Sequence, residues 1–164
     1  MLQPGKILSS QVIGNDIVFD CENNAILTLS FPEASIVRIR LSKVKNPRPS
    51  IMVLLGYVKE MLEETKFTLS EDSKIYKICT NTLTVTVEKQ DLSIKCFDNQ
   101  NKCFFSTSET KPYKVGKGYL LNFHMHQDEH FYGFGFQRKT LDARDINLLL
   151  PAITDGMKQQ PRIF

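Results

Sequence analysis

The chain has 164 residues, enough for one domain with a buried core. Its hydrophobic fraction of 41% and its charged fraction of 24% are ordinary for a globular protein. The formal net charge of +3 is too small to indicate a nucleic-acid partner. No apolar run approaches membrane-spanning length, and residues 1–10 lack the apolar centre of a signal peptide. We therefore expect a cytoplasmic protein with neither nucleic acid nor membrane as a partner.

Short segments of alternating apolar and polar residues fill the first quarter of the chain and predict β-strands. These strands are expected at residues 7–13, 16–21, 25–31 and 35–41. The dipeptide Gly14-Asn15 predicts a turn between the first two strands. Pro32 is expected to end the third strand, because proline cannot donate a hydrogen bond to a sheet.

The third and fourth predicted strands each have two unlike faces. In residues 25–31, one face is apolar and carries Leu27, Leu29 and Phe31. In residues 35–41, Arg38 and Arg40 lie on the face opposite to the apolar side chains. Such strands are typical of a sheet that is buried on one side only.

Residues 50–63 change to a helical period. Their apolar side chains recur three and four positions apart, at Ile51, Leu54, Leu55, Val58, Met61 and Leu62. Ser50 is available as the N-cap, whereas Gly56 is unfavourable inside a helix. We expect a helix that packs on its own domain; the alternative is an apolar stripe for a partner.

Strands return in the second half of the chain. They are expected at residues 75–80, 83–88, 92–97, 102–106, 119–126 and 129–136, with a polar loop at residues 107–118. In the second of these, Leu83, Val85 and Val87 share a face. About ten strands and one helix indicate an antiparallel sandwich or barrel.

The four cysteines are Cys21, Cys79, Cys96 and Cys103. None belongs to a C-x-x-C pair, so free buried thiols are expected in place of a zinc site. A four-residue hairpin loop at residues 98–101 would place Phe97 opposite Lys102 and Cys96 opposite Cys103. We expect that pair to be reduced.

The only three histidines, His124, His126 and His130, lie close together in the sequence. Three histidines are a ligand set that zinc accepts, and a histidine with Glu129 could act as an acid–base pair on a sugar. The alternative is that they face solvent while Phe123 and Met125 point inward. We expect no metal ion and no cofactor.

Residues 129–144 carry the most distinctive pattern, in which aromatic residues and glycines alternate before a Leu-Asp-Ala-Arg run. This segment resembles the end of the N-terminal domain of glycoside hydrolase family 31, the α-glucosidase and α-xylosidase family. The matching residues are Glu129, Phe131, Tyr132, Gly133, Phe134, Gly135, Leu141, Asp142 and Arg144. Phe136 and Asp145 depart from the family pattern, which usually has an acidic residue and a glycine there.

Weaker matches extend the resemblance over residues 25–144. They include the Arg38-Ile39-Arg40 run and the spacing of Thr80, Leu83 and Val85. The resemblance implies a mainly β, antiparallel β-supersandwich similar to galactose mutarotase, with one short helix. It also implies an N-terminal domain at residues 1–140 and a tail at residues 141–164 that leads towards a (β/α)8 catalytic barrel not contained in this chain.

In that family the barrel supplies both catalytic carboxyl groups of a retaining α-glycosidase. The resemblance therefore implies a non-catalytic domain that braces the barrel of the same polypeptide, borders the carbohydrate site and is inactive alone. Asp155 would correspond to a loop residue that contacts sugar hydroxyls; the alternative is a turn aspartate before Gly156. The alternative function is a free-standing carbohydrate-binding or mutarotase-like protein.

Overall fold

The computed structural model describes residues 4–44, 47–60, 62, 64–107, 113–115, 119–125, 128–130 and 132. The chain divides into two compact units between His124 and Met125, and the sheets below belong to the first. None of the helices in these ranges is long and apolar enough to cross a membrane. The predicted domain boundary at residue 140 lies outside the described residues.

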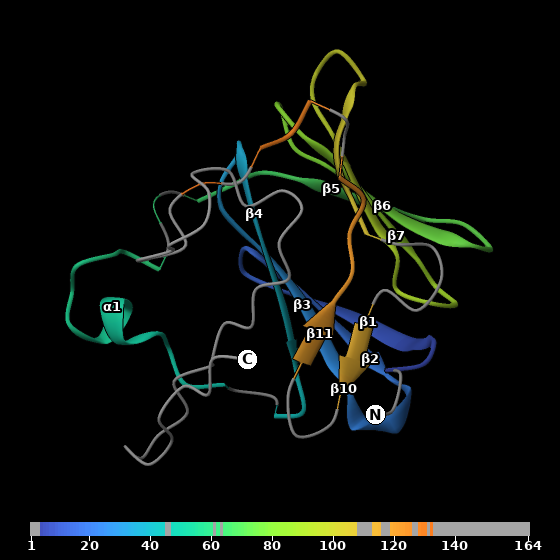
Figure 1. The fold of residues 1–164 in the computed structure, drawn as a ribbon, viewed down its shortest axis with the longest axis horizontal. Coiled ribbons are helices and arrows are strands. Elements are labelled where there is room, and N and C mark those ends of the chain that lie inside the picture. The colour runs from blue at the N-terminus through green and yellow to red at the C-terminus, as the bar shows by residue number, and fades with distance from the viewer. Residues whose placement is uncertain are drawn as a thin grey trace. The chain divides into compact units, whose positions relative to one another are not determined.

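The first sheet is antiparallel, with its strands in chain order (Figure 1). It comprises β1 (Ile7–Ile13), β2 (Asp16–Cys21), β3 (Ile26–Glu33) and β4 (Ile36–Ser42), with the 3₁₀ turn η1 (Glu22–Asn24) after β2. The predicted turn between β1 and β2 is confirmed. Gly14 has a φ of 57° there, a left-handed conformation that glycine adopts without steric cost.

Pro32 does not end β3, contrary to the prediction. The strand continues to Glu33, and its register with β4 shifts between Ser30 and Glu33. The N–H of Phe31 donates to the carbonyl oxygen of Asn15 at 3.0 Å. A bulge is one of the few places where a strand tolerates proline, because the ladder is already interrupted.

The second sheet is an antiparallel meander, also in chain order. It comprises β5 (Thr68–Glu71), β6 (Ile75–Cys79), β7 (Thr84–Glu88), β8 (Ile94–Phe97) and β9 (Cys103–Ser106). Sequence reasoning missed β5, because Leu69 is its only apolar side chain and an alternation cannot be detected.

The segment after β9 differs from the prediction. β10 (Tyr113–Val115) pairs with β11 (Tyr119–Leu121), so the expected polar loop contains a strand and the expected strand at residues 119–126 is short. Glu129, His130 and Tyr132 are not in a strand, although residues 129–136 were expected to form one. Three-residue strands are too short to show a period in the sequence.

Buried side chains of both large sheets form one hydrophobic cluster, so these sheets make a sandwich. The first sheet contributes Ile17, Phe19, Leu27, Leu29 and Phe31, and the second contributes Tyr76, Ile78, Val85, Val87, Ile94 and Cys96. The rings of Phe19 and Tyr76 meet with their centroids 5.0 Å apart. The predicted apolar faces of β3 and β7 are therefore confirmed.

The hairpin between β8 and β9 has a different register from the one predicted. Phe97 pairs with Cys103 and Cys96 pairs with Phe105, with a shift between them. The loop is anchored by Asp98, whose carboxylate accepts the N–H of Lys102 at 2.8 Å. Asn101, with a φ of 62°, completes a turn followed by a bulge. Residues 98–102 thus connect the two strands where residues 98–101 were expected to, and Cys96 does not face Cys103.

The short helix is confirmed, but its predicted length is wrong. α1 (Ile51–Leu54) is a single turn, capped by Ser50 as predicted. Gly56, at a φ of 75°, ends it. The N–H of Gly56 donates to Val53 O at 3.0 Å, and the N–H of Tyr57 donates to Met52 O at 2.9 Å. This is the Schellman pattern, so the glycine is a stop signal.

The alternation along β3 predicts a large difference between adjacent positions. Leu29→Ala removes a side chain with no exposed surface, and should lower the free energy of unfolding by about 2–5 kcal/mol. Thr28→Ala, on the opposite face, should change it by about 0.5 kcal/mol or less. Urea unfolding measures both, and equal losses would contradict the assignment of faces.

Candidate functional site

The structure describes few of the residues that carry the family pattern. Glu129 is half-buried, and the rings of His130 and Tyr132 stack with centroids 6.1 Å apart and planes inclined by 20°. The others lie outside the described residues: Phe131, Gly133, Phe134, Gly135, Leu141, Asp142, Arg144 and Asp155. Their roles, including the sugar contact expected of Asp155, stay predictions.

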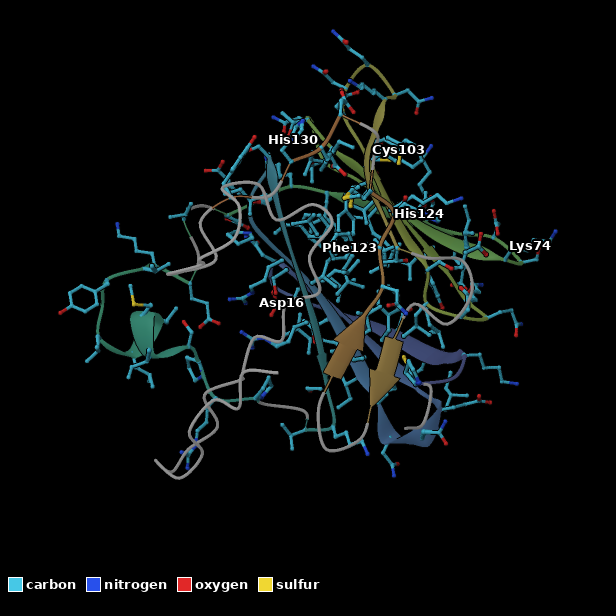
Figure 2. The ribbon with its side chains drawn as sticks, viewed as in Figure 1. Asp16, Lys74, Cys103, Phe123, His124 and His130 are labelled. Carbon is cyan, nitrogen blue, oxygen red and sulfur yellow. The ribbon has the colours of Figure 1, made fainter. Side chains whose placement is uncertain are left out.

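The structure does not bring the three histidines together among the residues that it describes. His124 closes the first unit, His130 belongs to the second, and His126 lies outside the described residues. His124, which Figure 2 labels, is exposed, and its backbone N–H donates to Ser106 O at 2.8 Å. Where the chain is described, no three His, Cys, Asp or Glu side chains come together in a way that could hold a metal ion.

Phe123 and Met125 do not point inward as expected, since they are 48% and 41% exposed. Phe123 forms only an isolated bridge with Thr107, so the alternation of a continuous strand does not apply to it. Its ring lies 6.2 Å from that of Phe105.

All four cysteines are free thiols in the structure. Burial raises the pKa of Cys96 to about 12, and the nearby Cys103 adds to that shift. Burial likewise raises the pKa of Cys21 to about 11. A thiol that stays protonated is a poor nucleophile and a poor metal ligand, so these two residues serve as core side chains.

The raised pKa of Cys96 predicts a loss of stability in alkali. Above pH 9, the unfolded chain releases the thiol proton and the folded chain keeps it until about pH 12. The free energy of unfolding should therefore fall across this window by up to about 1.4 kcal/mol per pH unit from this group. Cys96→Ala should show a shallower decline, whereas Thr86→Ala, a non-titrating truncation in β7, should keep the wild-type slope. Identical slopes for the wild type and Cys96→Ala would contradict this account.

The outer face of the first sheet carries polar side chains, with a few apolar ones among them, in cross-strand rows. Gln11, Val18, Thr28 and Arg40 face one another in sequence from β1 to β4. In the neighbouring row, Asp16 pairs with Ser30, and Ser30 pairs with Arg38. β2 thus contributes carboxylates, β3 contributes small hydroxyl residues and β4 contributes guanidinium groups.

These rows line a hollow that we call the outer-face groove. It has a volume of about 350 Å³, and its polar and apolar lining includes Gln11, Asp16, Val18, Asp20, Thr28 and Arg40. A second hollow of about 310 Å³ adjoins it at Asp16 and reaches Asn15 and Glu60. Figure 2 labels Asp16, the residue common to both hollows.

The segment that follows α1 is tied to this sheet by polar contacts. One guanidinium nitrogen of Arg38 lies 3.1 Å from Glu60 Oε1, and the other donates to Ser30 Oγ at 3.1 Å. The N–H of Leu62 donates to Pro32 O at 3.1 Å. The carboxamide of Asn15 donates to Phe31 O at 3.0 Å and accepts from the N–H of Thr65 at 3.3 Å.

In the sequence between β4 and Glu60, the first of the tied residues, is an exposed apolar segment that we call the linker surface. It consists of Ile51, Met52, Leu54, Leu55, Tyr57 and Val58. Leu54 and Leu55 are 66% and 61% exposed, and Tyr57 is 74% exposed. The expectation that this stripe packs on its own domain is therefore wrong, because a single helical turn ended by Gly56 cannot present one continuous face.

Sequence reasoning did not identify the outer-face groove. A signal existed, because the non-core positions of residues 16–21 and 25–31 carry Asp16, Asp20 and Thr28. What was missing is the strand register, which brings these residues beside Arg40.

The structure resembles parts of solved enzymes. It superposes on a GH31 dextranase from Flavobacterium johnsoniae, solved in complex with isomaltotriose, with a TM-score of 0.75 and 27% identity over 88% of this chain. It also resembles the cycloalternan-forming enzyme from Listeria monocytogenes, solved with a pentasaccharide substrate, with a TM-score of 0.66 and 19% identity over 85% of this chain. The chain spans only 18% and 13% of those two structures. No curated protein matches its sequence.

Two antiparallel sheets around one core, with one short helix among the described residues, define a galactose mutarotase-like β-sandwich domain. The family model of the glycosyl hydrolase 31 N-terminal galactose mutarotase-like domain matches residues 26–149. The chain belongs to this family, and the expected fold and resemblance are confirmed.

The contact between Arg38 and Glu60 predicts a local effect on the tied segment. Arg38→Met should speed hydrogen exchange of the Leu62 amide about fivefold, because an ion pair of this exposure is worth about 1 kcal/mol. Arg40→Met, on the same strand face, should leave that amide unchanged. Amide exchange by NMR measures both, and equal rates in the two variants would contradict the tie.

Proposed function

We propose that the chain is the non-catalytic N-terminal domain of a retaining α-glycosidase that hydrolyses α-linked glucosides. The family match and the solved relatives, a dextranase among them, support this proposal. The relatives' chains are several times longer than this one, and a (β/α)8 barrel, which needs about 250 residues, would carry the catalytic groups. On this proposal, Asp155 borders the sugar site.

The two carboxylates of the outer-face groove lack the spacing of a glycosidase pair. A retaining glycosidase needs two carboxyl groups about 5–5.5 Å apart, and an inverting one about 6.5–9.5 Å. Asp16 and Asp20, the two carboxylates of the outer-face groove, are four residues apart on one strand, which places their Cα atoms about 13 Å apart. This pair therefore does not fit either mechanism.

The linker surface is the observation that carries the proposed bracing role. Six exposed apolar side chains within eight consecutive residues are unusual on an isolated domain and mark an interaction site. Its residues belong to a segment that is held in place at Arg38, Pro32 and Asn15, so the patch is presented by the fold. The barrel of the same polypeptide is the partner that we propose for it.

The test uses the polypeptide encoded by the complete reading frame. It should hydrolyse para-nitrophenyl α-D-glucoside, and Leu54→Ser with Leu55→Ser should lower its melting temperature, because burying a leucine contributes about 1.5–3 kcal/mol. The same two substitutions should leave the melting temperature of the 164-residue chain unchanged, since both side chains are exposed in it.

Leu8→Ser is the control, because Leu8 is an equally exposed apolar residue, 62% exposed, outside the linker surface. Leu8→Ser should change the melting temperature of neither the complete polypeptide nor the 164-residue chain. A reading frame without α-glucosidase activity would overturn the proposed parent enzyme. An active parent that is insensitive to the leucine pair would overturn the docking role alone.

A further inference from the structure

We infer that the outer-face groove is a binding site for a neutral oligosaccharide. The inference goes beyond a bracing role, which needs no sugar site on this sheet. It draws on the groove's mixed chemistry: two carboxylates on β2, a guanidinium group on β4, and the hydroxyl and amide groups of Thr28 and Gln11.

The polar groups of the groove are available to a ligand. In the described part of the chain, no hydrogen bond or ion pair engages the side chains of Gln11, Asp16 or Arg40. Asp20 accepts one hydrogen bond, from Ser9 Oγ at 3.3 Å, and each carboxylate has about four acceptor positions. The groove thus offers unused donors and unused acceptors together.

The spacing of these groups keeps them from neutralising one another. Asp20 on β2 and Arg40 on β4 are separated by the width of two strand spacings, about 10 Å at the backbone. Thr28 lies between them in the row that ends at Arg40. A ligand that bridges this width must accept at one side and donate at the other, and sugar hydroxyl groups do both.

The charge balance disfavours a simple anion. Arg38 is engaged with Glu60, and among the described lining residues of the groove Arg40 is the one cation, against Asp16 and Asp20. A phosphate would gain one guanidinium contact but would be repelled by two carboxylates. A neutral polyhydroxyl ligand incurs no such repulsion.

The groove also has apolar surface and sufficient room. Val18 lies in the row between Gln11 and Thr28, and Ile13 and Pro47 complete the lining. Such carbon surface suits the C–H faces of a sugar ring. Ligand sites commonly measure about 300–1,000 Å³. With about 350 Å³ here and about 310 Å³ beyond Asp16, the two hollows together favour more than one sugar unit.

The experiment titrates the 164-residue chain with isomaltotriose and follows the backbone amides by NMR. The amide resonances of the groove residues on β1 to β4 should shift as isomaltotriose is added and should reach a plateau. Arg40→Gln should weaken the apparent Kd about tenfold, as expected for losing a charged hydrogen bond. Lys77→Gln, which removes an exposed charge from β6 in the other sheet, should leave the Kd unchanged.

Glycerol at equal hydroxyl concentration and inorganic phosphate are the matched probes. Neither should produce the same saturable shifts. The inference is overturned if isomaltotriose shifts no groove amides, if glycerol reproduces the shifts, if phosphate binds as well as the sugar, or if Arg40→Gln, folded by its spectrum, binds like the wild type. Any of these results leaves the proposed docking through Leu54 and Leu55 intact, since that rests on the parent enzyme's stability.

Discussion

Burial of one face of β3 is the constraint on which the rest of this domain depends. Leu27, Leu29 and Phe31 are fully buried, and their side chains belong to the cluster shared with the second sheet. Because side chains alternate along a strand, a slip of one residue would move this whole set to the solvent side. The core therefore sets the register of β2 and β4 as well, and with it the positions of the polar residues on the outer face.

The same register explains why the outer face carries opposite charges that remain apart. The small residues Ser30 and Thr28 separate the carboxylates of β2 from the guanidinium groups of β4. Arg38 reaches back to Ser30 and outward to Glu60, so one cation is used for structure. Arg40, one row along, is left for other contacts. A difference of two residues on one strand thus separates a structural arginine from one that is available to a ligand.

The bulge at Pro32 links the core to the exposed segment that follows β4. By interrupting the β3–β4 ladder, it frees backbone groups that Asn15 and Leu62 use. Gly56 then ends α1 after a single turn, which leaves its apolar residues uncovered. Proline and glycine at these two positions were recognised in the sequence as interruptions, but the structure shows that both are organising elements. Pro32 anchors the segment that follows β4, and Gly56 limits the length of its helix.

From the sequence alone, the strands in residues 7–41 and 75–106 were largely predictable, because alternation is a local property of a strand with one buried face. The mutarotase-like class and the glycoside hydrolase family followed from motifs that lie close together in the chain. The missed strand β5, the length of α1 and the loop of the β8–β9 hairpin depend on weak or non-local signals. Asp98 and Asn101 shape the connection between β8 and β9 through a hydrogen bond and a left-handed backbone that composition does not reveal.

The outer-face groove belongs to the tertiary structure alone. Asp16, Asp20, Thr28 and Arg40 come from three strands, and only pairing in one register places them around a common hollow. A sequence specifies which residues alternate along each strand, and so determined the buried and exposed faces here. Which exposed residues meet depends on the register between strands, and that register is decided by how the two sheets share one core.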